Sequence, residues 1–500
     1  MRLAFLLLLL FPAAQHAAAQ DAPSQDTSSQ DESPVRSTTL DWAMSQTDDG
    51  FAPALHGVWQ SRGYGWVLDI TPGSLTIYAA HEAGCIPVET SIYMNGPLRM
   101  YALADNTGNE VLLSYREANS TRYVLDRIDA VPAACHVEPP DDPRAVFDFL
   151  WGVMDEQYAF LDLYEIDWDA RYADLAPTIT DTTSEAVLFD ALAALIEGIE
   201  DSHLTLRGEA DGESRRAGGR PAPELGPVLR AGFAARDTTA EDAAETQGAF
   251  STRWYFANRR AIRDSLLAGA YETASGGNVF WGRFGGPNGR IGYINVAGMD
   301  GFADETEDGE DPAFADEIAA VYAVMGQAIA DLADTDALIM DVALNQGGYD
   351  EVSLGIAAHF AAEETLGLTK YAYGAKEDTR QSFMVVPAET VYTKPVVVLT
   401  SDVTVSAAET FTMEMRALPQ VTHAGSATRG ALSDMLFRTL PNGWQLSLSN
   451  EVYLDTEGVL WERVGIEPEQ PLPMFKAGLD GHLDALRMLA ADLAAEHTSR

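Results

Sequence analysis

The first third of the chain alternates apolar and polar residues in short runs. Between Leu55 and Cys135 the clearest runs are G-W-V-L-D-I, S-L-T-I-Y, R-M-Y-A-L, E-V-L-L-S-Y and R-Y-V-L-D-R-I, separated by Gly, Asn and Asp. Short alternating runs at regular spacing, with turn residues between them, are typical of antiparallel strands. The pattern therefore predicts a small antiparallel β domain over residues 53–140.

The spacing of apolar residues changes after Pro139, Pro140 and Pro143. Apolar residues then recur at helical intervals in A-V-F-D-F-L-W-G-V-M and in E-A-V-L-F-D-A-L-A-A-L-I-E-G-I. We expect a helical segment over 141–207. Residues 208–250 are rich in Gly, Ala and acidic residues, which indicates a loop or an irregular insertion, expected over 208–285.

The second half of the chain alternates strand patterns with helix patterns. R-I-G-Y-I-N-V and D-A-L-I-M-D-V-A-L are expected strands, and residues 314–332 and 352–361 are expected helices. This order predicts an α/β core with a largely parallel sheet over 286–475. Residues 476–500 supply a terminal amphipathic helix.

One strand-to-helix junction in this core carries a candidate nucleophile. The run Val396–Leu399 predicts a strand buried on both faces, and Ser406 opens a segment of helical composition. S-A-A-E from Ser406 to Glu409 fits the capping box, in which the serine only caps the helix. A helix N-terminus also favours developing negative charge, so the same serine suits acyl transfer. Both interpretations stay open at this point.

The other groups that acyl transfer needs have one candidate each. His203, in D-S-H-L-T-L, is the candidate base, and Glu462 is the candidate orienting acid. Gly347 and Gly348 follow a strand, where glycine permits the backbone angles that present an N–H to a substrate. Taken singly, these residues also fit a solvated histidine, an exposed strand carboxylate and an ordinary turn.

The N-terminus has the layout of a secretory signal. Arg2 precedes the apolar run Leu3–Pro12, and small residues follow in A-A-A-Q, so residues 1–20 are expected to be a cleaved signal peptide. A retained membrane anchor is the alternative. Residues 21–52, rich in Ser, Asp, Gln and Thr, indicate a disordered linker. We therefore expect export, to the periplasm or beyond the cell.

The two cysteines and the charge refine this expectation. A disulfide between Cys85 and Cys135 is plausible in an exported protein. The chain has 32 Lys and Arg against 76 Asp and Glu, a net charge of −44, which argues against binding nucleic acid or anionic lipid. No apolar run after the signal is long enough to span a membrane.

Four motifs occur in an order that resembles a known family. They are L-N-Q-G-G after the strand ending in Asp341, V-V-V-L-T with T-V-S-A-A-E, G-S-A-T-R-G-A, and E-x-x-G-I-x-P-E. Over residues 145–475 they resemble the tail-specific (C-terminal processing) and tricorn-like serine peptidases of clan SK. The helical stretch that ends in D-S-H is similar to the lead-in of the tricorn-like branch. The resemblance does not extend to the β domain.

The resemblance implies a ClpP/crotonase-like catalytic fold and hydrolysis of peptide bonds, with no metal or organic cofactor. The implied catalytic groups are the nucleophile Ser406, the base His203, the assisting Ser202 and the completing Glu462. The implied oxyanion hole joins the N–H of Ala407 to the N–H of Gly347 or Gly348. The implied partner is a peptide or polypeptide substrate.

The chain departs from the family pattern at three places. Where the processing branch has a lysine base in T-x-G-K, this chain has Ala431, and the neighbouring Arg429 cannot accept a proton. Ala343 replaces an arginine, and Glu469 replaces an aspartate. The base is therefore expected to be His203. A catalytically decayed binding protein on the same scaffold is the alternative. Hydrolysis of non-peptide esters is a further one, although no G-x-S-x-G elbow surrounds the serine.

Overall fold

The computed structural model describes residues 42–47, 49–82, 84–88, 100–103, 110–114, 120–236, 245–286, 288–304 and 312–498. The expected signal peptide and linker residues 21–41 lie outside these ranges. Within them, no helix combines the length and the apolar composition that crossing a membrane requires.

The N-terminal part is the predicted antiparallel β domain. Its main sheet has the order β1-β8-β9-β10-β4-β5-β6-β7. The strands are β1 (Ala43–Met44), β4 (Gly57–Ser61), β5 (Trp66–Ile70), β6 (Leu75–His81), β7 (Gly84–Pro87), β8 (Met100–Leu103), β9 (Glu110–Ser114) and β10 (Arg122–Ile128). A small hairpin, β2 (Gln46–Thr47) with β3 (Gly50–Phe51), and the 3-10 turn η1 (Pro53–Leu55) precede β4.

The structure extends this domain into the predicted linker. Ala43 and Met44 pair with Tyr101 and Met100, so β1 forms an edge of the main sheet. The prediction of a disordered linker up to residue 52 is therefore wrong for 43–47 and 49–51. The composition there is polar, but pairing to a sheet edge satisfies the backbone without needing large apolar side chains.

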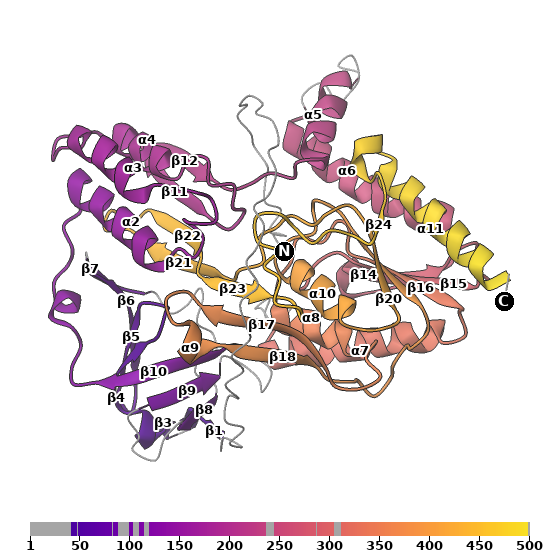
Figure 1. Ribbon diagram of the computed structural model, residues 1–500, viewed down its shortest axis with the longest axis horizontal. Coiled ribbons are helices and arrows are strands. Elements are labelled where there is room, and N and C mark those ends of the chain that lie inside the picture. The colour runs from indigo at the N-terminus through magenta and orange to yellow at the C-terminus, as the bar shows by residue number, and fades with distance from the viewer. Residues whose placement is uncertain are drawn as a thin grey trace.

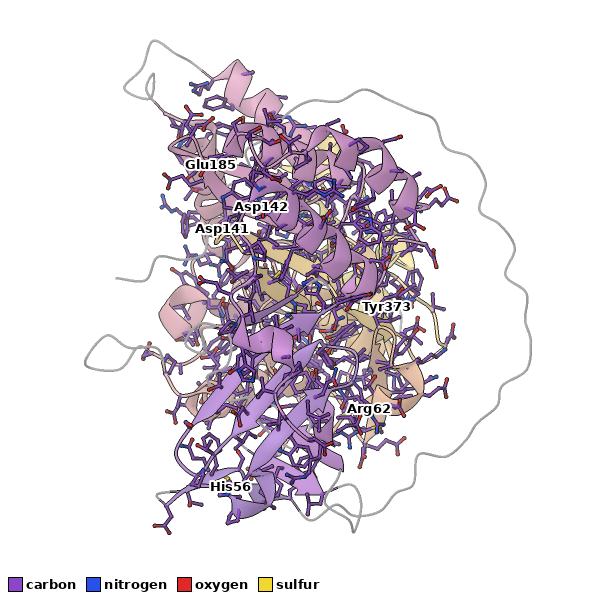
Figure 2. The ribbon with its side chains drawn as sticks, turned by 90° about the vertical axis from the view of Figure 1, so that its left-hand side faces the viewer. His56, Arg62, Asp141, Asp142, Glu185 and Tyr373 are labelled. Atoms are coloured by element: carbon purple, nitrogen blue, oxygen red, sulfur yellow. A yellow bond between two sulfur atoms is a disulfide. The ribbon has the colours of Figure 1, made fainter. Side chains whose placement is uncertain are left out.

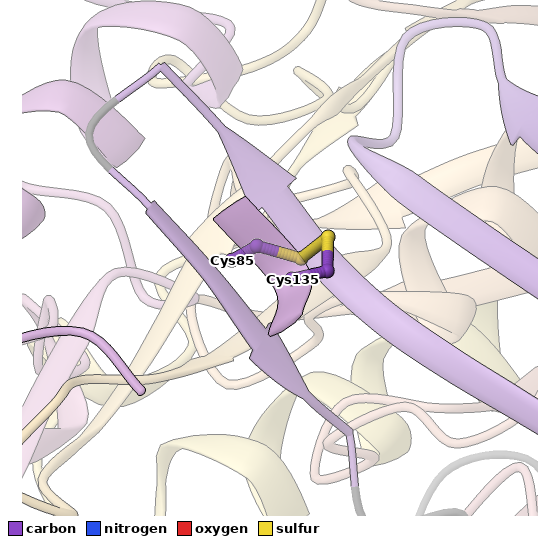
Figure 3. The surroundings of a disulfide bond; sticks show 2 residues. All are labelled: Cys85 and Cys135. Atoms are coloured by element: carbon purple, nitrogen blue, oxygen red, sulfur yellow. A yellow bond between two sulfur atoms is a disulfide. The ribbon is translucent and has the colours of Figure 1, made fainter. Parts of the chain in front are cut away.

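The disulfide that the sequence left open is present. Cys85 on β7 is bonded to Cys135, which lies in the 3-10 turn η2 (Ala133–His136) (Figure 3). The bond joins an edge strand to the segment that leaves the domain, across a sequence separation of 50.

Removing this disulfide is expected to lower the free energy of unfolding of the β domain. The chain-entropy model gives up to about 4 kcal/mol for a loop of this length, because the cross-link restricts the unfolded chain. Urea unfolding of Cys85→Ala/Cys135→Ala, followed by tryptophan fluorescence, measures the loss. A reductant should shift the wild-type curve and leave that of the double variant unchanged. Equal shifts in both proteins would contradict this origin.

A helical layer follows, as predicted. It contains α2 (Pro143–Gln157), α3 (Trp168–Leu175), η3 (Ala176–Thr178) and α4 (Glu185–Leu195). Asp142, labelled in Figure 2, caps α2 by accepting the N–H of Ala145 at 3.1 Å. Ser184 caps α4 through the N–H of Val187 at 3.5 Å. The layer leads through His203 into β11 (Thr205–Ala210).

The region 208–285 is not the irregular insertion that its composition indicated. It forms β12 (Glu213–Gly218), α5 (Leu225–Ala235), α6 (Gln247–Ala261), the π-turn η5 (Ile262–Leu266), β13 (Tyr271–Ala274), η6 (Ser275–Gly277) and β14 (Val279–Arg283). Leu229, Phe250 and Ile262 are buried in one core cluster with residues of the seven-stranded sheet described below. Burial of these side chains against the sheet therefore stabilises α5 and α6.

A seven-stranded sheet has the order β13-β14-β15-β16-β19-β20-β24. We call it the catalytic sheet, because the expected catalytic core is built on it. The added strands are β15 (Ile291–Val296), β16 (Ala337–Asp341), β19 (Val396–Thr400), β20 (Val421–Gly425) and β24 (Gln470–Pro471). Pairing from β15 to β24 is parallel, while β13 and β14 are antiparallel. The predicted α/β class with a largely parallel sheet is confirmed.

Helices cover both faces of this sheet (Figure 1). On one face lie α7 (Phe314–Leu332), α8 (Asp350–Ala357) and α10 (Ala407–Arg416), and on the other lie α5, α6 and α11 (Gly481–Thr498). Along β16, Leu338 and Met340 join the first core, and Ala337 and Ile339 join the second. Burial on both faces explains the unbroken apolar runs of these strands.

Two smaller sheets connect the catalytic core to the N-terminal parts. One has the order β12-β11-β22-β21, with β21 (Met435–Thr439) and β22 (Gln445–Ser449). The other has the order β18-β17-β23, with β17 (Thr365–Ala372), β18 (Gln381–Val385) and β23 (Glu451–Leu454). The short α9 (Lys376–Thr379) and η7 (Phe475–Ala477) complete the described elements.

These sheets bring residues from distant parts of the sequence together. β11, just after His203, pairs with β22, with Thr205 opposite Ser447. Arg62 of the β domain, labelled in Figure 2, forms ion pairs with Asp126 at 2.7 Å and with Asp378 of α9 at 3.0 Å. The β domain and the helical layer are thus attached directly to the catalytic part.

Candidate active site

Ser406 stands in a strained turn between β19 and α10. Its backbone angles are φ 61° and ψ −130°, whereas a capping residue normally has an extended backbone. Such a conformation is unfavourable for a residue with a Cβ and persists only where the surroundings enforce it. Ser406 is partly exposed between the buried Val405 and Ala407. This conformation favours a functional serine over an ordinary cap.

Glu409 holds the turn in place. Its carboxylate is fully buried and accepts the N–H of Ser406 at 3.2 Å, of Gly430 at 2.7 Å and of Ala431 at 2.9 Å. It also accepts the hydroxyl of Thr428 at 2.6 Å. Burial raises the pKa of Glu409, and these hydrogen bonds act in the opposite direction. The Glu409 contact of the capping box is therefore present, and it holds the serine turn in place.

The Gly347–Gly348 turn lies directly against Ser406. A Cβ on Gly347, at φ +90°, would stand 2.7 Å from the Cβ of Ser406 and 3.1 Å from the N of Ala407. A Cβ on Gly348 would stand 2.3 Å from the carbonyl oxygen of Met299. Only glycine fits at either position, so the turn can approach the serine closely.

The two glycine N–H groups differ in their partners. Gly347 donates to Oδ1 of Asn345 at 2.8 Å. Gly348 forms a parallel β-bridge with Met299. The N–H of Met299 donates to the carbonyl of Gly347, and the N–H of Tyr349 donates to the carbonyl of Met299. In such a bridge the N–H of Gly348 points away from Met299. Among the described residues, neither Gly348 nor Ala407 donates its N–H to an acceptor. These two N–H groups are therefore available to a substrate.

His203 is buried, with 6% of its surface exposed. Its N–H donates to Oδ1 of Asp201 at 2.8 Å, and its carbonyl accepts the hydroxyl of Ser447 at 2.7 Å. In the part of the chain that the structure describes, its Nδ1 is buried without a hydrogen-bond partner. Burial lowers the pKa of His203, while Asp201 and a backbone hydrogen bond at Ser433 raise it.

Glu462 is also buried rather than exposed on a strand, with 1% of its surface exposed. Its Oε2 accepts the N–H of Leu432 at 3.0 Å and of Ser433 at 3.2 Å. Its Oε1 is buried and has no partner among the described residues. Burial raises the pKa of Glu462 well above its usual value, and the charge of Asp201 adds to this.

The segment from Ala431 to Ser433 is hydrogen-bonded to all three residues. The carbonyl of Ala431 accepts the N–H of Ser406 at 3.0 Å, and the next two N–H groups bind Glu462. The backbone of Ser433 also bonds to His203. The structure thus brings Ser406, Glu462 and His203 to one short segment.

Two of the expected contacts are not made within the described residues. No hydrogen bond joins the hydroxyl of Ser406 to the ring of His203. The hydroxyl of Ser202 donates to the carbonyl of Arg220 at 3.1 Å and not to another of the proposed catalytic side chains. Catalytic hydrogen bonds often tighten only when substrate binds.

Sequence models of two known domains match the regions that build this site. The model of peptidase family S41 matches residues 290–472, and the model of the tricorn protease C1 domain matches residues 139–197. The first match contains both turns and Glu462, and the second covers the helical layer that leads to His203. Residues 290–472 therefore form an S41 peptidase domain. The protein is a serine-type peptidase of the tail-specific and tricorn-like group, as the motifs indicated.

Several solved structures are similar to this S41 peptidase. A candidate peptidase from Parabacteroides merdae shares 25% identity over 70% of this chain and 97% of its own, with a TM-score of 0.51. Mature CPAF shares 13% identity over 71% of this chain and 99% of its own, with a TM-score of 0.47. The tricorn protease shares 13% identity over 87% of this chain and 47% of its own, with a TM-score of 0.40.

The departures from the family pattern have clear structural settings in this S41 peptidase. Ala431, which replaces the lysine base of the processing branch, is buried beside the serine turn. Arg429 is buried and donates from Nη1 to the carbonyl of Arg220 at 3.0 Å. Burial lowers its pKa to about 10, which still leaves it protonated near neutral pH. Arg429 thus acts as a structural donor.

The sequence analysis missed two residues that shape the base. Asp201 is fully buried and binds the backbone N–H of His203, and the hydroxyl of Tyr158 donates to its Oδ2 at 3.0 Å. Asp201 stands two residues before the histidine in E-D-S-H, which was a visible signal. Tyr158, the residue that follows α2, had no such signal, because only the fold brings it to Asp201.

Proposed function

We propose that the protein is an exported serine endopeptidase that works through an acyl-enzyme on Ser406. The observation that carries the proposal is that the strained Ser406 turn packs directly against the Gly347–Gly348 turn. The N–H groups of Ala407 and Gly348 at these turns have no acceptor among the described residues. Attack of the Ser406 oxygen on a peptide carbonyl forms a tetrahedral oxyanion. The N–H groups of Ala407 and Gly348 would stabilise that charge.

His203 is the proposed general base. It would take the proton of Ser406 and return it to the leaving amine, and a water would then hydrolyse the acyl-enzyme. Buried polar atoms without partners are rare, and both Nδ1 of His203 and Oε1 of Glu462 are of this kind. A small movement when substrate binds would give these atoms partners. Ser202 remains the proposed assisting group and Glu462 the proposed completing acid.

Export rests on two observations. The N-terminal pattern Arg2, Leu3–Pro12 and A-A-A-Q is that of a secretory signal, and a disulfide joins Cys85 to Cys135. We propose a periplasmic or extracellular location and peptide substrates. N-terminal sequencing of the protein recovered from cell fractions tests this location: a mature chain starting near residue 21 outside the cytoplasm supports it, and an uncleaved cytoplasmic chain opposes it.

Covalent labelling tests the nucleophile directly. A fluorophosphonate probe should modify wild-type protein on Ser406, located by peptide mass spectrometry, and should not label Ser406→Ala. The probe reports nucleophile activation without knowledge of the natural substrate. Labelling of another residue, or equal labelling of both proteins, would reject the acyl-enzyme on Ser406.

Gly347→Ala is expected to reduce kcat by about 10²- to 10³-fold, the effect of losing one oxyanion donor. The added Cβ would press on the Cβ of Ser406 at 2.7 Å and displace the turn. Gly374→Ala is the matched control, because Gly374 also has positive φ, +72°, but no atom lies within 4 Å of the added Cβ. Peptide hydrolysis and thermal unfolding of both variants should show strain in each and loss of kcat in the first alone.

A further inference from the structure

A buried histidine on the last helix lies outside the mechanism proposed above. His482 is the second residue of α11, which packs beside α6 on one face of the catalytic sheet (Figure 1). None of its surface is exposed. A histidine buried so completely requires partners for both ring nitrogens.

His482 has both partners. Its Nε2 lies 2.9 Å from Oδ2 of Asp341, which is also fully buried, and its Nδ1 lies 3.0 Å from Oδ1 of Asn258 on α6. Burial alone would raise the pKa of Asp341, but His482 and the hydroxyl of Tyr293 lower it overall. Because an ionised carboxylate only accepts hydrogen bonds, His482 donates Nε2–H to Asp341.

Asp341 is the last residue of β16, and it organises the chain that follows. Its Oδ1 accepts the N–H of Ala343 at 3.0 Å. The carbonyls of Val342 and Ala343 in turn accept the hydroxyls of Thr404 and Ser401. These two hydroxyls come from the loop that ends at Ser406. The Asp341 carboxylate therefore fixes the point where the strand before the glycine turn meets the loop before the serine.

We propose that His482 is a positioning residue: by holding Asp341, it sets where the Gly347–Gly348 turn stands relative to Ser406. This inference rests on the proposed oxyanion role of that turn. The path runs from α11 through one carboxylate to the end of β16, and six residues further along the chain lies Gly347. Displacements of about 1 Å at a reacting centre are enough to cost about 10²-fold in rate.

The simpler alternative is that His482 only docks α11 on the sheet. Substitution of Leu486 distinguishes docking from positioning. Leu486 lies one turn further along the same helix and is fully buried in the same core cluster as Ile339 and Leu399. Its side chain has no polar atom. Leu486→Ala loosens the docking of the helix and leaves the Asp341 hydrogen bond in place. Its cost in stability is expected to equal or exceed that of His482→Ala.

The test compares His482→Ala, His482→Gln and Leu486→Ala in the full mature protein. We expect His482→Ala to lower kcat on a fluorogenic peptide about 10- to 100-fold with KM changed less than about twofold. Hydrogen exchange, followed by mass spectrometry, should speed up over 341–349. His482→Gln, whose amide N–H can reach Asp341, should recover most of the rate. Leu486→Ala should unfold more easily and keep kcat.

Several results would overturn the inference. They are an unchanged kcat in His482→Ala, an equal loss of kcat in Leu486→Ala, or unaltered exchange over 341–349. If His482→Ala does not fold, Asp341→Asn and His482→Gln are compared instead. Loss of kcat in Asp341→Asn with retention of kcat in His482→Gln supports the inference. Retention of kcat in Asp341→Asn with loss in His482→Gln rejects it. The exchange measurement needs no catalysis. A wild-type protein inert towards the fluorophosphonate would thus reject the function of Ser406 and leave the exchange result valid.

Discussion

Ser406→Ala is expected to lower kcat/KM for peptide hydrolysis by about 10⁴- to 10⁶-fold, the range for removing a serine nucleophile. The free energy of unfolding should change by less than about 0.5 kcal/mol, the usual limit for a substitution that removes no structural contact. The backbone of the turn is held by Glu409 through the N–H of Ser406, which alanine retains. Steady-state kinetics and urea unfolding of the same preparation measure both quantities.

The chain supplies a matched control for this prediction. Ser184 is a helix-capping serine whose side chain accepts the N–H of Val187 at 3.5 Å. Ser184→Ala should cost about 1 kcal/mol of stability, as capping residues do, and should leave kcat/KM unchanged. If Ser406→Ala instead lost stability and kept its activity, Ser406 would be the cap that its S-A-A-E sequence also fits.

His203→Gln is expected to have the second-largest effect, a loss of about 10⁴- to 10⁶-fold in kcat/KM. Glutamine keeps most of the volume of the buried ring but cannot serve as a base near neutral pH. The exposed His136 offers a control, since His136→Gln lies outside the site and should keep full activity. Comparable activity in His203→Gln and wild type would reject His203 as the base.

The pH profile of the wild-type enzyme gives an independent test of the same residue. Burial holds the pKa of His203 below its usual value of 6.5, against the opposing effect of Asp201. The imidazole is therefore neutral at pH 7 and able to accept a proton, and it becomes protonated only at lower pH. We expect kcat/KM to fall on acidification with an apparent pKa below 6.5. A limb above that value would contradict the assignment.

The helices of region 208–285 show where composition misled the sequence analysis. Gly, Ala and acidic residues indicated an irregular insertion, yet α5 and α6 form and cover one face of the catalytic sheet. Asn258 of α6 even holds the ring of His482. Apolar residues such as Leu229 and Phe250 pack on the sheet, and this burial stabilises the two helices whatever the composition of the region as a whole.

The sequence by itself determined the local features of this protein. Apolar periodicity placed the β domain, the helical layer and the strands around Asp341 and Val396, because side-chain spacing follows the period of the element. The order of four motifs indicated the family and singled out Ser406 and Glu462, and the separate D-S-H stretch singled out His203.

Only the tertiary structure decided how these residues act on one another. It buried Glu462 and packed Gly347 so closely against Ser406 that an added Cβ would stand 2.7 Å from the Cβ of the serine. It left the N–H of Gly348 without an acceptor among the described residues. It also brought His482 to Asp341, 141 residues away. Such contacts join residues far apart in sequence, so no local period records them. They exist because two faces of one sheet must be covered, and covering them determines which side chains meet.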